Sequence, residues 1–154
     1  MKRFIAVLAL VLLSGCATVG RDRAVQAHQA DIGSTAVALA MGAAEGNPLG
    51  WLALPLKWWQ MKIISEMPEA TQRAEAYLHV AAVTNGAVAN NLCVAAALAV
   101  PALLPFAMAC PIAGLAWWAH ESSNDYDRRF YEAFCAEWMK EKEGNTCSPF
   151  VATN

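Results

Sequence analysis

Charged residues are scarce in this chain and absent from a long part of it. Only 16% of its 154 residues are Asp, Glu, Lys or Arg, against roughly 25% in a typical soluble protein. Residues 76–120 contain none of the four, and a soluble fold of this size rarely has so long an uncharged run. The chain also lacks a basic stripe that would neutralise phosphates, so we expect no nucleic-acid partner.

Recognisable catalytic and cofactor motifs are missing as well. The chain has no nucleophile elbow, no glycine-rich phosphate loop and no zinc-protease helix. His28, His79 and His120 are scattered, and with Cys93 and Cys110 they match no metal-ligand spacing. We interpret these two cysteines as small apolar packing residues. The sequence therefore predicts no enzyme, no cofactor and no metal.

The N-terminus, by contrast, has the order of a bacterial secretory signal. A basic start precedes an apolar run at residues 4–13, which is too short for a spanning helix. The run leads into Leu13-Ser14-Gly15-Cys16, which resembles the lipobox of bacterial lipoprotein precursors. The resemblance implies that residues 1–15 are removed and that the sulfur of Cys16 takes a diacylglycerol. Several acyl chains then anchor the mature N-terminus.

Three apolar segments follow a polar tether, which we assign to residues 16–30. The segments are residues 32–56, which are broken by a Glu-Gly-Asn-Pro stretch, residues 77–100 and residues 103–119. The last two are long enough to cross a bilayer, and Pro101 and Pro105 between them favour a tight hairpin.

Tryptophans lie near the ends of these segments, as in the aromatic belts of membrane proteins: Trp51, Trp58, Trp59, Trp117 and Trp118. We therefore expect an all-α fold. Residues 31–120 would form a small membrane helical bundle with two or three spanning helices.

Residues 121–154 form the C-terminal unit. The stretch from Asn124 to Glu143 predicts an amphipathic helix, with Ser122 or Ser123 as its cap and Gly144 as its end. Its aromatic face recurs every four residues: Tyr126, Phe130, Phe134 and Trp138. Such a face can dock on the bundle, lie on the bilayer or bind a partner, and docking is the simplest interpretation.

The number of spans decides on which side of the membrane the C-terminus lies. With three spans it is cytoplasmic, most Lys and Arg residues lie inside, and Cys135 and Cys147 stay reduced. With two spans, residues 32–56 are re-entrant or interfacial. The C-terminus then returns to the oxidising side, where Cys135 and Cys147 can form a disulfide. The distribution of basic residues favours three spans.

One polar pattern occurs inside the apolar part of the chain. Asp31, Thr35, Gly42 and Glu45 fall on one face of a helix. The stretch 31–48 resembles the first span of a family of short multi-span bacterial membrane proteins of unknown function, and the resemblance implies no activity. Acids at membrane depth mark an ion path or a polar contact. Alternatively, both acids lie at the helix ends among the headgroups.

Three amides lie within the segment 77–100, at Asn85, Asn90 and Asn91. We interpret them as hydrogen-bonding groups that face the first apolar segment. Together with Asp31, Thr35 and Glu45, they form a candidate intramembrane polar seam.

We expect a lipid-anchored integral membrane protein with a non-enzymatic interaction or structural role in the envelope. Its partners would be membrane lipids and either a membrane protein or a second copy of the chain. The alternative is a small ion or solute transport component that uses the polar seam. Ala17 after the modified cysteine is compatible with outer-membrane sorting in the lipoproteins that this N-terminus resembles. Because apolar spans oppose such export, we expect the inner membrane, with the anchor on the periplasmic side.

Overall fold

The computed structural model describes residues 19–43, 50–123 and 125–151. Five α-helices and one 3-10 helix follow one another in these ranges: α2 (Gly20–Ala40), α3 (Gly50–Ser65), α4 (Ala70–Ala99), η1 (Pro101–Ala109), α5 (Cys110–Ser123) and α6 (Tyr126–Glu141). The described part of the chain contains no strand. The expected all-α class is confirmed.

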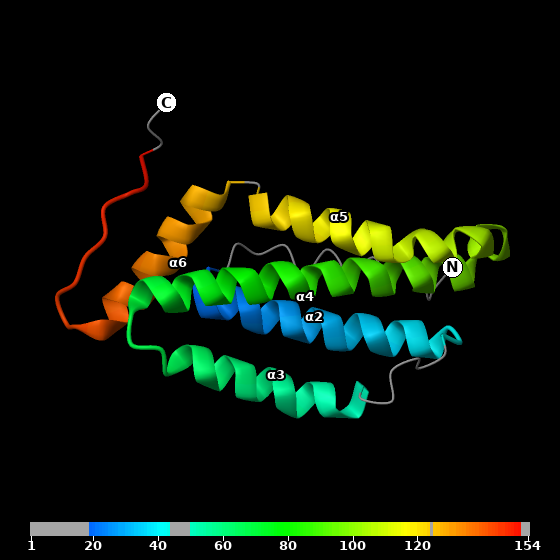
Figure 1. The fold of residues 1–154 in the computed structure, drawn as a ribbon, viewed down its shortest axis with the longest axis horizontal. Helices are drawn as coiled ribbons and strands as arrows, with labels where there is room; N and C mark the ends of the chain where they lie inside the picture. Colours follow the sequence, from blue (N-terminus) through cyan, green and yellow to red (C-terminus); the bar gives the residue numbers. More distant parts are fainter. Residues whose placement is uncertain (1–18, 44–49, 124, 152–154) are drawn as a thin grey trace.

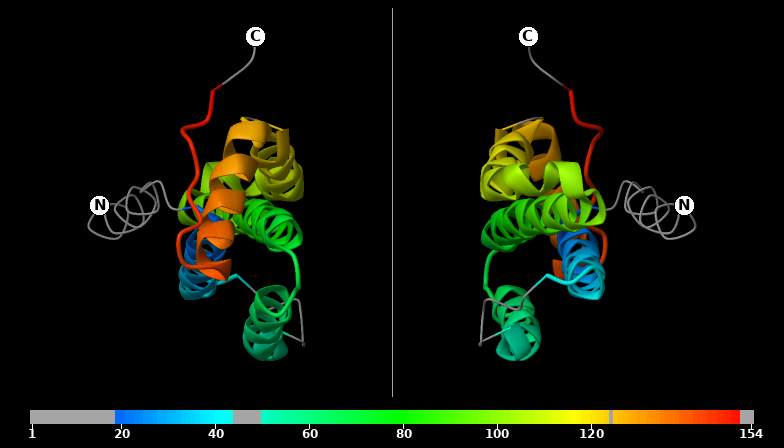
Figure 2. Two further views of the ribbon diagram at one scale, coloured as in Figure 1. Left: turned by 90° about the vertical axis from the view of Figure 1, so that its left-hand side faces the viewer. Right: turned by 90° about the vertical axis from the view of Figure 1, so that its right-hand side faces the viewer.

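Helix α4 is the centre of the molecule. Its 30 residues correspond to a length of about 45 Å at 1.5 Å per residue. Helix α2 packs along one side of α4, and η1 with α5 packs along the other (Figure 1). Helix α3 lies below α2 and α4 and has few contacts with α4, whereas α6 crosses the end where α2 and α4 begin (Figures 1 and 2).

Small side chains let α2 and α4 approach each other. Ala24, Ala27 and Ala38 are buried on α2, and Ala70, Ala74, Ala81 and Ala82 are buried on α4. The larger core residues gather where α3 joins this pair: Met61, Ile64, Tyr77 and Val80 pack around Ala24.

Helices α4 and α5 approach each other closely at one glycine on each helix. A Cβ added to Gly86 would lie 2.8 Å from the carbonyl oxygen of Gly114, and a Cβ added to Gly114 would lie 2.8 Å from that of Gly86. Only glycine at both positions permits this approach. Toward the tip of the hairpin, a disulfide joins Cys93 of α4 to Cys110 at the start of α5, with a Cα–Cα distance of 5.4 Å.

The connection between α4 and α5 differs from the expected tight hairpin. Residues 101–109 form the 3-10 helix η1, which has Pro101 at its first position and Pro105 in its interior. Proline fixes φ near the helical value but donates no backbone hydrogen bond, so the segment can turn helically without continuing α4. The expected segment 103–119 thus consists of most of η1 and most of α5.

The N-terminal part of the structure differs from the preferred sequence interpretation in two places. Residues 32–56 do not form one segment, because α2 ends at Ala40 and α3 begins at Gly50. Gly42 has a φ of +96°, a conformation that glycine adopts at low cost and that ends helices. Residues 20–30, which we assigned to a tether, form the first half of α2 and pack on the bundle.

The C-terminal helix forms close to the expected bounds. Its aromatic pairs stack four residues apart, Tyr126 on Phe130 with ring centroids 6.1 Å apart and Phe134 on Trp138 at 5.9 Å. The expected serine caps were wrong, because α5 extends to Ser123 and Asp125 precedes α6 in a left-handed conformation.

Two helical segments of the described chain are long and apolar enough to cross a membrane, Ala70–Ala99 and Ala102–Ser123. They differ in how far the protein covers them. In the most apolar stretch of each, 39% of the first segment is buried inside the molecule but only 11% of the second. The second segment therefore presents an apolar surface that no described part of the chain covers.

Charge is distributed along the long axis of the bundle. The end formed by η1, the last turns of α2 and the first turns of α3 carries no Asp, Glu, Lys or Arg among the described residues (Figure 1). The opposite end, where α6 crosses, carries Arg21, Asp22, Arg23, Arg73, Glu75, Glu121 and the charges of α6. We call these the uncharged end and the charged end.

Candidate functional site

A polar cluster joins α2 and α4 midway along the bundle. The side-chain amide nitrogen Nδ2 of Asn91 lies 3.1 Å from Asp31 Oδ1, 3.2 Å from Ser34 Oγ and 3.0 Å from Thr35 Oγ1. An amide has two N–H donors, so the three oxygens share them. Asp31 also forms an ion pair with Lys57 of α3. The cluster therefore links three helices through one amide and one carboxylate.

His28 lies one turn before Asp31 on α2 and is 8% exposed. Neither of its ring nitrogens has a hydrogen-bond partner among the described residues. Burial lowers the pKa of His28, Lys57 lowers it further, and Asp31 raises it. The imidazole is therefore held in its neutral form beside the cluster.

The structure brings together only part of the predicted polar seam. Asp31, Thr35 and Asn91 meet as expected. Asn90 Nδ2 donates to Asn91 Oδ1 over 3.4 Å, and its Cβ lies beside Gly114, so Asn90 faces α5. Asn85 is half-buried and makes no side-chain hydrogen bond within the described ranges. The prediction that all three amides face the first segment was therefore wrong for Asn90.

Glu45 and Cys16 lie outside the described residues. The cluster instead contains Ser34, Lys57 and His28, which the sequence analysis did not select. Ser34 and His28 each lie three residues from Asp31, a helical spacing that could have indicated them. Lys57 carried no such signal, because its approach depends on how α3 folds back along α2.

Two ionic networks fasten the charged end. Arg73 is buried and donates to Glu137 (3.1 Å), Glu141 (2.6 Å) and the carbonyl oxygen of Met67 (2.7 Å), which holds α6 against α4. Separately, Glu121 of α5 accepts from Arg23 of α2 (2.5 Å) and Arg129 of α6 (3.2 Å). The second network combines two positive charges with one negative charge.

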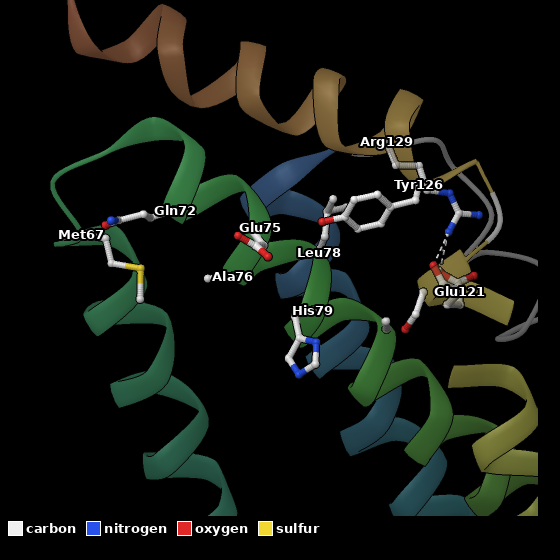
Figure 3. Close-up of a pocket in the computed structure, with 11 residues that line it drawn as sticks. Met67, Gln72, Glu75, Ala76, Leu78, His79, Glu121, Tyr126 and Arg129 are labelled. Atoms are coloured by element: carbon white, nitrogen blue, oxygen red, sulfur yellow. Dashed lines mark hydrogen bonds and ion pairs between the residues drawn. The ribbon is translucent and has the colours of Figure 1, made fainter. Parts of the chain in front are cut away.

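A pocket of about 500 Å³ opens beside this second network, between α4, the end of α5 and the start of α6 (Figure 3). Its polar lining includes Glu75, His79, Ser122, Tyr126 and Arg129. The phenol of Tyr126 points toward Glu75 in Figure 3. Burial raises the pKa of Tyr126, and the nearby Glu75 carboxylate raises it further, so the phenol stays neutral.

The four cysteines in the described ranges pair in two disulfides. Cys135 of α6 bonds to Cys147 of the tail, with a Cα–Cα distance of 5.8 Å, the pairing expected for an oxidising location. The interpretation of Cys93 and Cys110 as separate packing residues was wrong, because they form the other disulfide. A spacing of 17 residues does not by itself indicate a disulfide. The pairing depends on the axial alignment of α4 and α5, which the sequence does not give. Among the described residues, no cluster of three or more His, Cys, Asp or Glu side chains is suited to hold a metal.

No family model, curated protein or solved structure matches this chain.

Proposed function

We propose that the protein is a lipid-anchored membrane protein of the bacterial envelope, with an interaction or structural role and no catalysis of its own. Lipid at Cys16 holds the N-terminus. The hairpin of α4, η1 and α5 enters the bilayer. The charged end, with α6 across it, stays on the aqueous side and is the part available to a membrane-protein partner or a second copy of the chain.

The observation that carries this proposal is the uncovered apolar surface of η1 and α5. Met108 is 88% exposed, Ile112 67%, Phe106 64% and Leu115 62%. Contiguous apolar surface of this kind is rare on soluble monomers and marks contact with lipid or with another protein. Hydrocarbon is the fitting environment, because the same surface belongs to the uncharged run 76–120. Transfer to hydrocarbon is favourable at roughly 25 cal/mol per Å² of apolar area.

The tryptophans support the same placement. Trp117 and Trp118 lie near the end of α5, at the boundary with the charged end, and both are exposed. Trp58 is 78% exposed and Trp59 is exposed beside it on α3. Indole rings favour the headgroup level of a bilayer.

A two-span arrangement is the better supported orientation. Helices α2 and α3 are separate elements, and neither is among the two described segments long and apolar enough to cross a membrane. The disulfide between Cys135 and Cys147 belongs in an oxidising compartment. Two spans place the charged end on the periplasmic side together with the anchor. The hairpin tip carries no charge that would oppose its entry into the bilayer. Within the cell, we propose the inner membrane as the location, with the outer membrane as the alternative.

The test combines loss of the anchor with alkaline extraction. Cys16→Ala should accumulate as an unprocessed precursor, detected by mass spectrometry, and should still sediment with membranes after an alkaline wash. The matched control is Ser14→Ala, which changes a neighbouring small residue and should be processed at Cys16. Recovery of the Cys16→Ala chain in the wash supernatant would contradict membrane insertion. A mature N-terminus other than Cys16 in the wild type would contradict lipidation.

A transport component remains the alternative function, with Asp31 and Asn91 as the polar groups at depth. The ion pair with Lys57 and the hydrogen bond from Asn91 occupy both carboxylate oxygens of Asp31. A carboxylate with both oxygens engaged has less capacity to coordinate a passing cation. This favours a structural role for the cluster, and hence the interaction function above.

A further inference from the structure

The pocket at the charged end lies at the boundary between the charged residues and the uncharged run 76–120. It is lined by both Glu75 and Glu121, and these are the charged residues that flank the uncharged run 76–120. Below them, Ala76, Leu78 and Ala82 continue the lining with apolar side chains. If the hairpin enters hydrocarbon as proposed, the pocket lies at the level of the lipid headgroups.

The polar lining offers one negative and one positive region. Glu75 forms no ion pair with any described residue, and the ring of Tyr126 lies beside it (Figure 3). On the opposite side, Arg129 lines the pocket, and only its Nη1 is engaged, with the carboxylate and carbonyl oxygens of Glu121. Its remaining N–H groups have no partner among the described residues and supply the positive region. A ligand with an ammonium and an anionic group would match both regions.

A hydroxyl in the same pocket lacks a partner. The Oγ atom of Ser122 is buried and has no hydrogen-bond partner among the described residues, and Ser122 lines the pocket near Glu121. An unsatisfied buried hydroxyl costs free energy unless a ligand or water completes it. Because this oxygen has almost no accessible surface in the structure, a phosphate oxygen would accept from it only after the Ser122 side chain turns its hydroxyl into the pocket, on the side of Arg129.

We propose that this pocket binds the headgroup of a zwitterionic phospholipid with a primary ammonium. The ammonium donates to the Glu75 carboxylate and rests against the Tyr126 ring. The phosphate lies toward Arg129 and Ser122, and the acyl chains run along the apolar surface of the hairpin. The volume of about 500 Å³ lies in the range of small-molecule pockets. The inference rests on the proposed membrane insertion.

The test titrates the purified mature chain in detergent with dioctanoyl phospholipids and counts bound lipid by native mass spectrometry. Phosphatidylethanolamine should bind more tightly than phosphatidylcholine, whose trimethylammonium donates no N–H, and more tightly than anionic phosphatidylglycerol. Glu75→Gln should weaken phosphatidylethanolamine about tenfold or more and abolish its advantage over phosphatidylcholine. Ser122→Ala should weaken all three lipids several-fold.

Glu143→Gln is the matched control, since it removes an exposed carboxylate away from the pocket and should leave binding unchanged. Equal binding of phosphatidylethanolamine and phosphatidylcholine, a preference for phosphatidylglycerol, or an unaffected Glu75→Gln variant would each overturn the proposal. The titration is separate from the alkaline wash. A chain that stays in membranes but shows no headgroup preference loses this inference alone, whereas a chain released by the wash loses the proposed function.

Discussion

The imidazole of His28 is buried beside Asp31 and Lys57, and neither of its nitrogens has a partner among the described residues. A buried neutral histidine resists protonation, whereas the same residue in the unfolded chain protonates near its usual pKa of 6.5. The unfolded state then binds more protons as the pH falls through that value. The stability contribution is therefore fully present above pH 6.5 and is lost as the pH falls toward the lowered pKa of the folded state.

Replacement of His28 by Leu should flatten this pH dependence. Leu has a similar volume and leaves no new polar group unsatisfied, so the variant should be at least as stable as the wild type at about pH 8. At about pH 5.5 it should be clearly more stable, because it has no proton to take up. Thermal unfolding in detergent at the two pH values measures the difference. Gln29→Leu is the control on the exposed side of the same helix and should keep the wild-type pH dependence. If His28→Leu lost as much stability between the two pH values as the wild type does, His28 would not be the source of the pH dependence.

At this scale the sequence predicted the meeting of Asp31, Thr35 and Asn91 but not the rest of the cluster. Helical spacing places Asp31 and Thr35 on one face of a helix. An asparagine inside an apolar segment, such as Asn91, needs a hydrogen-bond partner on a neighbouring helix. The choice between Asn90 and Asn91 depends on the rotation of α4 about its axis, since consecutive residues differ by about 100°. That rotation is set by the simultaneous packing of α4 against α2 and α5. It cannot be read from the sequence of α4 alone.

Among the elements, the α4–α5 pair is fixed by the reciprocal contact of Gly86 and Gly114. Contacts of this kind hold membrane helices together where water supplies no hydrophobic driving force. The contact also sets the axial offset of the two helices, and therefore the position of Ser122 and Glu121 relative to Glu75. The shape of the pocket at the charged end thus depends on two glycines in the middle of the bundle.

Gly86→Ala should separate the two helices. The added methyl would meet the Gly114 carbonyl oxygen at 2.8 Å, and backbone must move to relieve it. We expect a loss of about 1–3 kcal/mol, the usual cost of overpacking, measured by thermal or chemical unfolding in detergent.

Ala87→Leu is the control on the exposed side of α4, where extra atoms meet no neighbour. It should unfold like the wild type. Equal stability of Gly86→Ala and the wild type would show that the hairpin tolerates a wider spacing than the structure has.

The element boundaries show where sequence reasoning stopped. The Glu-Gly-Asn-Pro stretch breaks residues 32–56 in the sequence, but the sequence leaves open whether the segment spans the bilayer or is re-entrant or interfacial. Hydrophobic periodicity and composition show that both halves of residues 32–56 are apolar. They do not show whether the second half continues the first helix or folds back along it. The polar surface of the first half of α2 is typical of a tether, whereas its buried face consists of the small or uncharged residues Ala24, Ala27 and His28.

The whole molecule combines a charged end, an uncharged end and two disulfides. With two spans the C-terminus, with Cys135 and Cys147, lies on the oxidising side, whereas Cys93 and Cys110 lie toward the hairpin tip, at the opposite end of the bundle. The mature chain has five cysteines in total, of which Cys16 is blocked by lipid in the proposed form. Among the remaining four, the redox state of Cys135 and Cys147 reports on which side of the membrane the C-terminus lies.

Thiol labelling under denaturing conditions should therefore find no free thiol on Cys135 or Cys147 before reduction, and four labelled cysteines after it. Mass spectrometry of the labelled mature chain counts them. Cys135→Ser should release one thiol, on Cys147, and leave the other disulfide intact. Free Cys135 and Cys147 in the wild type would instead place the C-terminus in the cytoplasm and restore the three-span arrangement.

The disulfide between Cys93 and Cys110 also closes a covalent ring around η1. A protease that cuts once inside this ring opens the peptide chain but releases no fragment, since both pieces stay joined through sulfur. The cut chain would migrate as an intact protein until a reductant is added. Protection of the tip from proteolysis can therefore be judged only on reduced samples, and a nicked hairpin can keep α4 and α5 together after its peptide continuity is lost.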